Sequence, residues 1–371
     1  MSVSRNSFPA SFAASGMVLF WGVCLSAQTG KPLEWGIEWV DAEDISLLQS
    51  NWMGEFGSAL WDTSVSFAFA DYDLEYVPVS FDFNGQETDL NENNFALSVN
   101  TQYQASQQFA WMFGAGAYDG FTNYRSIWLD EYYRQQYSDL GNAPGAENYV
   151  EADPKGINAT VGGRWEYLPA TGFAQFNISW LEDDVSPGYE LDFDGLRRSD
   201  LTLATWALNV STENILSRNL RSYLGIRATD TTARSTRYAI DGALYAALGA
   251  SWIGRLQVGA AREDPQFESV YAGVALESHI TDELSWFADF RYYDDSGEIE
   301  NALLFTSAAP GLSSKRVGIG VRWIGDVWSA RVYLANLETD YDPTRENLDF
   351  FQNLYKDRDW TICQVAVSRT L

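Results

Sequence analysis

Alternating apolar and polar residues run along most of this chain, in segments of about ten residues from residue 60 to the C-terminus. In one segment Phe95, Leu97 and Val99 alternate with Ser98 and Asn100. A period of two residues is typical of a β-strand whose two faces meet different environments. The pattern predicts fourteen strands, at about 65–69, 95–103, 109–117, 159–167, 174–180, 206–210, 220–228, 238–248, 256–260, 270–276, 284–292, 317–323, 328–334 and 363–371.

Short turns and long loops alternate between these strands. The turns at Ala170-Thr171 and Gly325-Asp326 are short. The long connections lie at about 71–93, 119–156, 182–200, 294–315 and 338–359. Short turns on one rim and long loops on the other, with an even strand count, are typical of a barrel that crosses the outer membrane. We therefore predict an all-β fold, a transmembrane antiparallel up-and-down β-barrel over residues 59–371, with long extracellular loops and short periplasmic turns.

A soluble sandwich or propeller would also contain alternating strands. Two features favour the barrel. Aromatic residues such as Trp165, Trp286 and Trp323 end the apolar faces, at the level expected for a headgroup girdle. The opposite face carries Gly, Ser, Asn, Gln and Arg, which a water-filled lumen accommodates better than a dry core does.

The last segment, WTICQVAVSRTL, places apolar residues at 363, 365, 367 and 371. With this segment, residues 60–371 resemble the outer-membrane β-barrel proteins of Gram-negative bacteria, in a porin-like form with no named subfamily. The family usually ends in Phe, whereas this chain ends in Leu371. The resemblance implies a location in the cell outer membrane and contact with membrane lipid and lipopolysaccharide. It also implies recognition of the last strand by the barrel-assembly machinery.

The first 58 residues are interpreted separately. Residues 1–27 are predicted to be a signal peptide, because Arg5 precedes the apolar run GMVLFWGVCLSA and a small-residue cleavage site at Ala27. A first buried strand or a short anchor is the alternative. Cleavage would leave Cys363 as the single cysteine, so we expect no internal disulfide. Residues 28–58 are interpreted as a periplasmic extension or a plug, with a helix starting after Asp41, or as a loosely ordered leader.

Composition narrows the function. The chain of 371 residues is 46% hydrophobic and 15% aromatic, which excludes disorder, and its formal charge of -27 argues against a nucleic-acid partner. No apolar stretch after residue 27 approaches the roughly 20 residues of a membrane-spanning helix.

Charged residues on the face opposite the apolar one are the candidates for lining a lumen. The arginines are Arg164, Arg221, Arg227, Arg237, Arg255, Arg291, Arg316, Arg322 and Arg331, and the acids are Glu166, Asp241, Glu263, Glu277 and Asp289. One interpretation is a selectivity device, because facing charges define a constriction in a pore. The other is that these residues pair with one another and fill the barrel without selecting solutes.

The long loops hold most of the acidic residues and one distinctive segment. Runs such as Glu182-Asp183-Asp184 have the oxygen ligands that Ca²⁺ or Mg²⁺ takes, although solvated surface acid is the favoured interpretation. Aromatic and charged residues recur at helical spacing in 123–141, which predicts a loop helix that narrows the barrel mouth or caps its rim. Its constriction candidates are Trp128, Asp130, Glu131, Tyr133, Arg134 and Tyr137.

The sequence offers no catalytic constellation. Its single histidine, His279, follows Ser278 directly, so the two lie on opposite faces of a strand and do not form a base and nucleophile pair. The chain contains no Cys/His metal motif, phosphate loop or dinucleotide fingerprint. We therefore expect a protein that is not an enzyme and uses no cofactor or metal.

The expected function is a porin-like channel through which small hydrophilic solutes diffuse, with a lean toward anions from the arginine-lined lumen. One alternative is a non-conducting surface barrel that binds partners or divalent cations through its acidic loops. Another is a transporter barrel for hydrophobic substrates. The transported solute, an open or plugged lumen, and a monomeric or trimeric state are not determined by the alternation of one chain.

Overall fold

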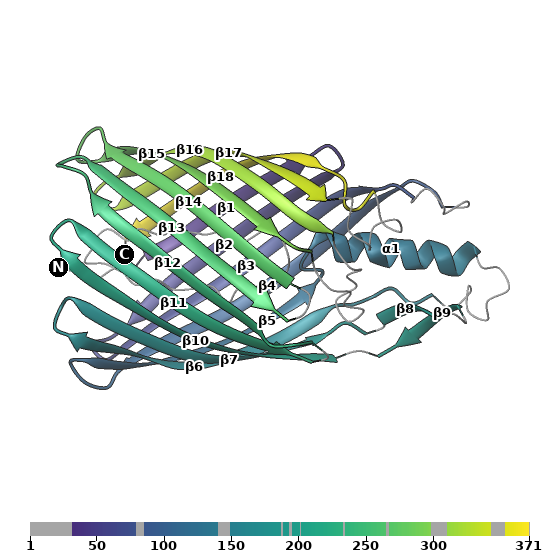
Figure 1. Cartoon of the computed structure of the whole chain (residues 1–371), viewed down its shortest axis with the longest axis horizontal. Coiled ribbons are helices and arrows are strands. Elements are labelled where there is room, and N and C mark those ends of the chain that lie inside the picture. The colour runs from purple at the N-terminus through teal and green to yellow at the C-terminus, as the bar shows by residue number, and fades with distance from the viewer. Residues whose placement is uncertain are drawn as a thin grey trace.

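The computed structural model describes residues 32–370 except 79–84, 140–148, 187, 193–194, 201, 233, 265–266, 298–309 and 343–352. Its main body is one closed antiparallel barrel of sixteen strands (Figure 1). The first eight wall strands are β1 (Pro32–Ala42), β2 (Ile45–Gly57), β3 (Trp61–Tyr76), β4 (Thr88–Gln104), β5 (Phe109–Gly120), β6 (Lys155–Leu168), β7 (Gly172–Asp184) and β10 (Thr202–Ser217). The others are β11 (Leu220–Thr231), β12 (Arg237–Ala247), β13 (Trp252–Glu263), β14 (Phe267–His279), β15 (Leu284–Asp295), β16 (Gly311–Ile324), β17 (Trp328–Asp342) and β18 (Arg358–Thr370).

The strand count of fourteen was wrong by two. All fourteen expected strands are present, and the additional ones are β1 and β2, which occupy most of the segment interpreted as an extension or plug. The chain after Asp41 forms a turn and then β2 instead of a helix. β1 pairs with β18 on one side and β2 on the other. This pairing closes the barrel and satisfies the backbone hydrogen bonds of both edges, which lipid would leave unpaired.

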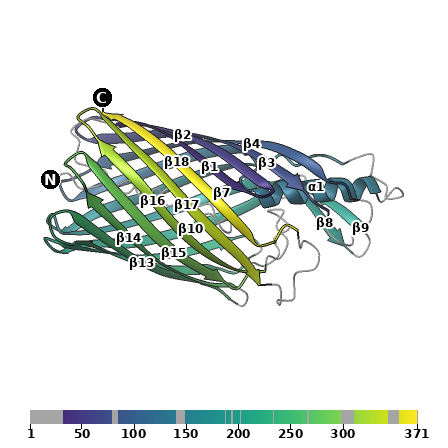
Figure 2. The same cartoon turned by 90° about the horizontal axis from the view of Figure 1, so that it is seen from above.

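The two rims differ as the sequence predicted. Pro32 of β1 pairs with Thr370 of β18, so both ends of the wall lie at the rim of short turns. The opposite rim carries the helix α1 (Tyr124–Asp139) and a small hairpin of β8 (Gly188–Asp192) and β9 (Gly195–Ser199). Figures 1 and 2 both place α1 and this hairpin at the loop end of the barrel, with α1 extending outward from the ends of the strands. The predicted signal peptide lies outside the described residues.

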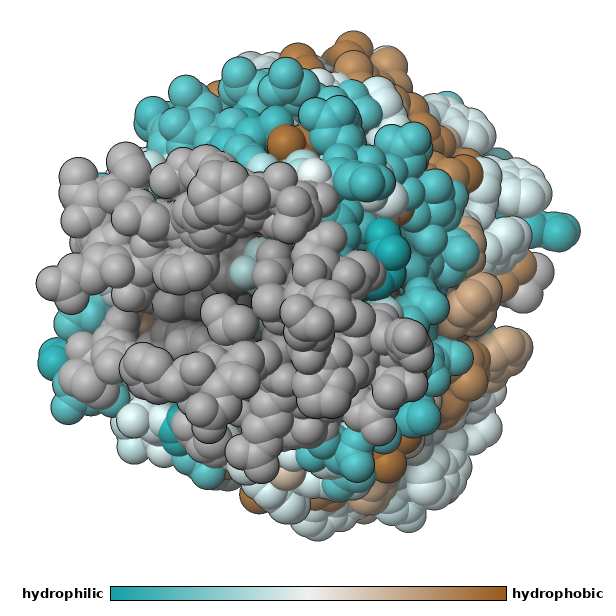
Figure 3. All heavy atoms as spheres, turned by 90° about the vertical axis from the view of Figure 1, so that its right-hand side faces the viewer, coloured by the Kyte–Doolittle hydropathy of each residue, from teal (hydrophilic) through white to brown (hydrophobic). Residues whose placement is uncertain are grey.

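The outer surface of the wall is apolar. Val317, Ile319 and Ile226 are more than half exposed, at 59%, 58% and 55%. Figure 3, which views the molecule from the loop rim, shows hydrophilic residues gathered around that rim and hydrophobic residues along the flank. Exposed tryptophans mark the short-turn rim, at Trp61, Trp165, Trp252, Trp323 and Trp328. An apolar belt edged by aromatic residues is the surface that a membrane barrel presents to lipid. No helix in the described part of the chain is long and apolar enough to cross a membrane.

Candidate functional site in the barrel lumen

The strand register places every arginine predicted to line the lumen on the inner face. In β16, Arg316 and Arg322 alternate with the exposed Val317, Ile319 and Val321. The acids Glu166, Asp241, Glu263, Glu277 and Asp289 occupy inner-face positions by the same alternation. The lumen is therefore the space that these side chains border.

Several of these residues form ion pairs between strands. Arg322 pairs with Glu277 at 3.0 Å, and Arg316 pairs with Asp289 at 3.1 Å. Each of these four side chains is 14–18% exposed, so the pairs are mostly but not fully screened from water. Pairs of this kind fix the arginine heads in position. This arrangement, in which the charged residues pair with one another and fill the barrel, was also considered from the sequence.

Aromatic rings support the guanidinium groups. Arg331 lies over Phe287 at 4.6 Å from the ring centroid, and Arg291 lies over Tyr271 at 5.1 Å. Arg164, on the other side of the barrel, lies over Phe173 at 4.7 Å. A cation over an aromatic face is attracted by the ring quadrupole, and the flat guanidinium stacks well there.

Glycines let these rings lie flat on the inner wall. A Cβ atom at Gly318 would come within 2.1 Å of the Tyr333 hydroxyl, and one at Gly320 within 2.2 Å of the Phe287 ring. The two rings are stacked at 5.8 Å with an interplanar angle of 11°. Because the rings rest against the wall, they take less space from the lumen than rings that project inward.

Some charged lumen residues were missed by the sequence analysis. Glu34 and Glu38 of β1 and Glu55 of β2 lie on inner-face positions, and Glu213 of β10 pairs with Arg221 at 2.8 Å. The alternation of Leu33, Trp35, Ile37 and Trp39 with these acids was the available signal for β1. Once these acids are included, the arginine surplus inferred from the sequence disappears.

Charge is nevertheless unevenly distributed around the lumen. In the described residues, the inner faces of β3, β4 and β5 carry no arginine and are built mainly of small or uncharged side chains. Examples are Ser66, which bonds to Ser98 at 2.7 Å, and Gly114, which lies against Asn100. Eight of the nine predicted arginines lie on β11, β12, β13, β15, β16 and β17. The free space of the lumen is expected to lie toward the small-residue wall.

The outer mouth contains an apolar cluster that includes α1. The helix predicted in 123–141 is confirmed, and Trp128 is 2% exposed with its ring 4.7 Å from that of Tyr76. Leu74, Ile362 and Leu129 belong to the same buried cluster. Inner-face residues from β1, β3, β17 and β18 thus pack with the helix, which covers the outer end of the small-residue wall.

The other constriction candidates are anchored within or beside α1. Glu131 pairs with Arg134 and also accepts a hydrogen bond from Gln135 at 2.7 Å. Tyr133 is half-buried and packs edge-on against Tyr132. The side chain of Tyr137 lies outside the described residues.

Asp130 holds the segment that follows the helix. Its carboxylate accepts hydrogen bonds from the Tyr149 hydroxyl and from the Ala152 backbone N–H. Burial raises the pKa of Asp130 to about 7, and the nearby Glu151 and Glu92 add to this effect against the opposing hydrogen bonds. The loop beyond the membrane therefore contains a carboxyl group that changes charge near neutral pH.

The acidic loops show local roles where they are described. Asp183 accepts a hydrogen bond from the Tyr118 hydroxyl at 2.5 Å, and Asp295 accepts from the backbone N–H groups of Gly297 and Leu312. Across the described ranges, no group of three or more His, Cys, Asp or Glu residues is arranged to hold a metal ion. His279 and Ser278 lie at the short-turn rim on opposite faces of β14.

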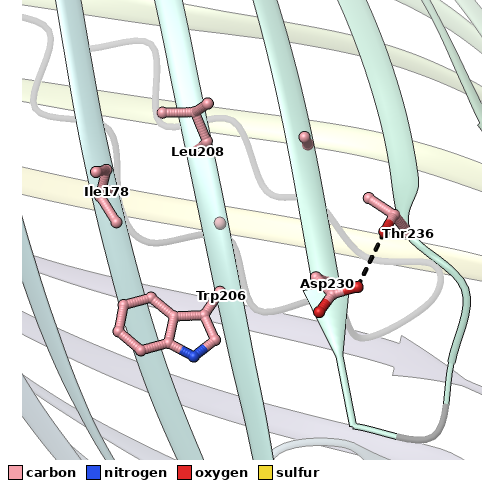
Figure 4. A pocket seen from close by; sticks show the side chains of 7 residues that line it. Ile178, Trp206, Leu208, Asp230 and Thr236 are labelled. Atoms are coloured by element: carbon pink, nitrogen blue, oxygen red, sulfur yellow. Dashed lines mark hydrogen bonds between the residues drawn. The ribbon is translucent and has the colours of Figure 1, made fainter.

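One pocket lies on the outside of the barrel and not in the lumen. It is a shallow apolar depression over β7, β10 and β11, lined by Ile178, Trp206, Leu208 and Ala228 (Figure 4). Asp230 and Thr236, joined by a hydrogen bond of 2.9 Å, close its end near the loop rim. Trp206 and Leu208 are 54% and 47% exposed, so this depression faces lipid.

No protein-family model and no curated protein matches this sequence. Solved structures resemble its fold. CdiB from Acinetobacter baumannii aligns with a TM-score of 0.54 and 9% identity, over 91% of this chain and 60% of that chain. A bacterial polysaccharide outer membrane secretin aligns with a TM-score of 0.50 and 9% identity, over 93% of this chain and 100% of that chain. The chain has the fold of an outer-membrane β-barrel.

The likeness to these structures is a likeness of fold. The chain spans about 60% of the length of CdiB. The toluene transporter TodX of Pseudomonas putida aligns with a TM-score of 0.47 and 11% identity, over 93% of this chain and 90% of that chain. At such identities the comparison establishes the fold, and function has to be argued from the lumen itself.

Proposed function

We propose that this outer-membrane barrel is a passive channel for small hydrophilic solutes. The observation that carries the proposal is the asymmetric inner wall, in which Arg–Glu and Arg–Asp pairs face a wall built mainly of small or uncharged side chains. Ionised pairs on one side favour a hydrated lumen, and short side chains on the other leave room for it. The α1 helix over the small-residue wall narrows the outer end of this path.

Planar-bilayer recording of the refolded barrel tests this proposal. We expect discrete conductance steps in potassium chloride, and uptake of small sugars into liposomes that contain the barrel. A barrel that inserts, resists heat denaturation in a gel-shift assay and yet passes neither ions nor sugars would overturn the proposal.

A transporter for hydrophobic substrates is the second candidate. The apolar cluster between α1 and the inner faces of β1, β3, β17 and β18 favours it, because an apolar solute would enter the barrel through such a lining. The same liposomes separate the two functions. A hydrophobic-substrate barrel would speed transfer of an apolar fluorescent probe and show no ionic current, and Trp128→Ala would slow that transfer.

A further inference from the structure

Two pairs of arginines lie directly opposite each other on neighbouring strands of the inner wall. Arg291 of β15 is the register partner of Arg316 of β16, and Arg322 of β16 is the register partner of Arg331 of β17. Like charges placed directly opposite each other across two strands destabilise a sheet. The two arginine pairs on β15, β16 and β17 therefore lower the stability of the sheet, and the barrel fold does not require them.

Each arginine pair has a carboxylate beside it that binds one of the two arginines. Asp289 bonds to Arg316, and Glu277 bonds to Arg322 and to Ser285. The buried Nε of Arg316 has no hydrogen-bond partner among the described residues.

The arginine heads are held rigidly. Arg331 lies over the rings of Phe287 and Tyr333, at 4.6 and 5.7 Å, and these rings rest on Gly320 and Gly318 between the two arginine pairs. Side chains held in this way lose little further freedom when they bind a ligand. A planar guanidinium matches the geometry of a carboxylate or phosphate group, and it does not match chloride in this way.

Other charges face this patch from β1. Glu38 acts electrostatically on Arg316, and Glu34 acts on Arg331. These acids limit the attraction for anions in general, so the patch is suited to oxyanions that make directional hydrogen bonds. Six residues separate Arg316 from Arg322 along β16, or about 20 Å at 3.3 Å per residue, so the two pairs bind separately.

We propose that the pairs Arg291/Arg316 and Arg322/Arg331 are two successive binding stations for small oxyanions, above all organic carboxylates, along the lumen. This proposal rests on the proposed channel function and names the solute class that the channel favours. A carboxylate held between two guanidinium groups relieves their repulsion, and the second pair offers it a second binding site further along the lumen.

Block of chloride current is the test. Sodium acetate and sodium phosphate are added to separate bilayers that contain the full-length barrel in potassium chloride. We expect acetate to lower the current saturably. Arg316→Gln and Arg331→Gln should each raise its half-blocking concentration about twofold, because the other station remains, and the double variant should raise it about tenfold. Arg262→Gln is the matched control, because Arg262 lies on the outer face of β13 and is 68% exposed. It should keep the half-blocking concentration of the unmodified barrel.

The outcomes are distinguishable. Phosphate block that exceeds acetate block would retain the stations and change their favoured oxyanion. Equal half-blocking concentrations in all five proteins would overturn the stations while leaving the channel intact. Absence of any current would overturn the channel instead. In that case saturation-transfer NMR of acetate with the detergent-solubilised barrel and its Arg316→Gln variant still decides whether the stations bind.

Discussion

Arg358 and Asp44 form a bidentate ion pair inside the outer mouth of the barrel. The Nε and one terminal nitrogen of Arg358 donate to the two carboxylate oxygens of Asp44 at 2.9 and 3.0 Å. The two side chains are 1% and 3% exposed. Arg358 begins β18 and Asp44 lies in the β1–β2 turn, so this pair joins the last strand to the first hairpin where the barrel closes.

The substitution Asp44→Ala is expected to lower the free energy of unfolding by about 3 to 5 kcal/mol, because it leaves a buried guanidinium without its counter-charge. Urea titration of the barrel folded in lipid vesicles measures the loss. Lys356→Ala is the control, since Lys356 also pairs with Asp44, at 3.1 Å, but is 35% exposed. Its cost should stay below about 1 kcal/mol. Equal losses of unfolding free energy in the two variants would show that burial does not make the Arg358–Asp44 pair more stabilising than the exposed one.

The same pair predicts a dependence on acid. Burial alone would raise the pKa of Asp44, but the hydrogen bonds and charge of Arg358, and then of Lys356, outweigh it and hold this pKa below its ordinary value. The folded state therefore binds a proton less readily than the unfolded state. The contribution of the pair is complete above about pH 4 and is lost as the pH falls through the lowered pKa. Urea titrations at pH 3 and pH 6 should show a smaller pH effect in Asp44→Asn.

Asp130 predicts the opposite dependence. Its pKa of about 7 in the folded protein exceeds the value of about 3.9 for a free carboxyl group. The segment around Tyr149 and Ala152 should therefore dock best in acid and loosen as the pH rises from about 4 to about 7. Hydrogen–deuterium exchange at 149–152, corrected for the intrinsic rate, measures this opening.

The substitution Asp130→Asn should abolish most of that pH dependence, because the amide oxygen can still accept from Tyr149. Asp153→Asn is the control, since Asp153 is exposed and lies close in sequence. Unchanged pH dependence in Asp130→Asn would assign the effect to another group, such as Glu92.

Gly318 is expected to control the width of the lumen. The three atoms nearest to a Cβ at this position all belong to the Tyr333 side chain, so Gly318→Val should push that ring off the wall into the lumen. We expect a lower single-channel conductance with a barrel that still folds. Gly242→Ala is the control, because its Cβ would meet only a backbone oxygen at 3.6 Å. A conductance equal to that of the unmodified barrel would show that the path does not pass Tyr333.

Trp128 is expected to hold α1 over the mouth. The substitution Trp128→Ala removes a fully buried ring, at a cost of about 3 to 5 kcal/mol for sites of this kind, and should release the helix. We expect a larger conductance and faster protease cleavage within α1. Arg134→Ala changes a side chain that is 46% exposed and should leave both measurements unaltered. A smaller conductance in Trp128→Ala would mean that the helix supports the open path.

Strand positions and faces were predictable because each depends on residues two apart in the chain. The nine arginines predicted to line the lumen were placed on one face in this way, and the strand register puts each of the nine on the inner face. The segment with β1 and β2 was misinterpreted because its acids Glu34 and Glu38 interrupt an otherwise apolar run and were not counted as a lumen face. Because the hairpin of β1 and β2 was not predicted, its acids were left out of the expected lumen charge.

The sequence by itself determined the all-β class, the two unlike rims and the loop helix, since periodicity and connection length are local properties. Only the tertiary structure decided that β1 closes on β18, that Arg316 lies across from Arg291, and that Arg358 reaches Asp44. Each of these contacts depends on register between distant segments. That register is set by closure of the whole barrel, where every backbone donor and acceptor at the two edges must find a partner.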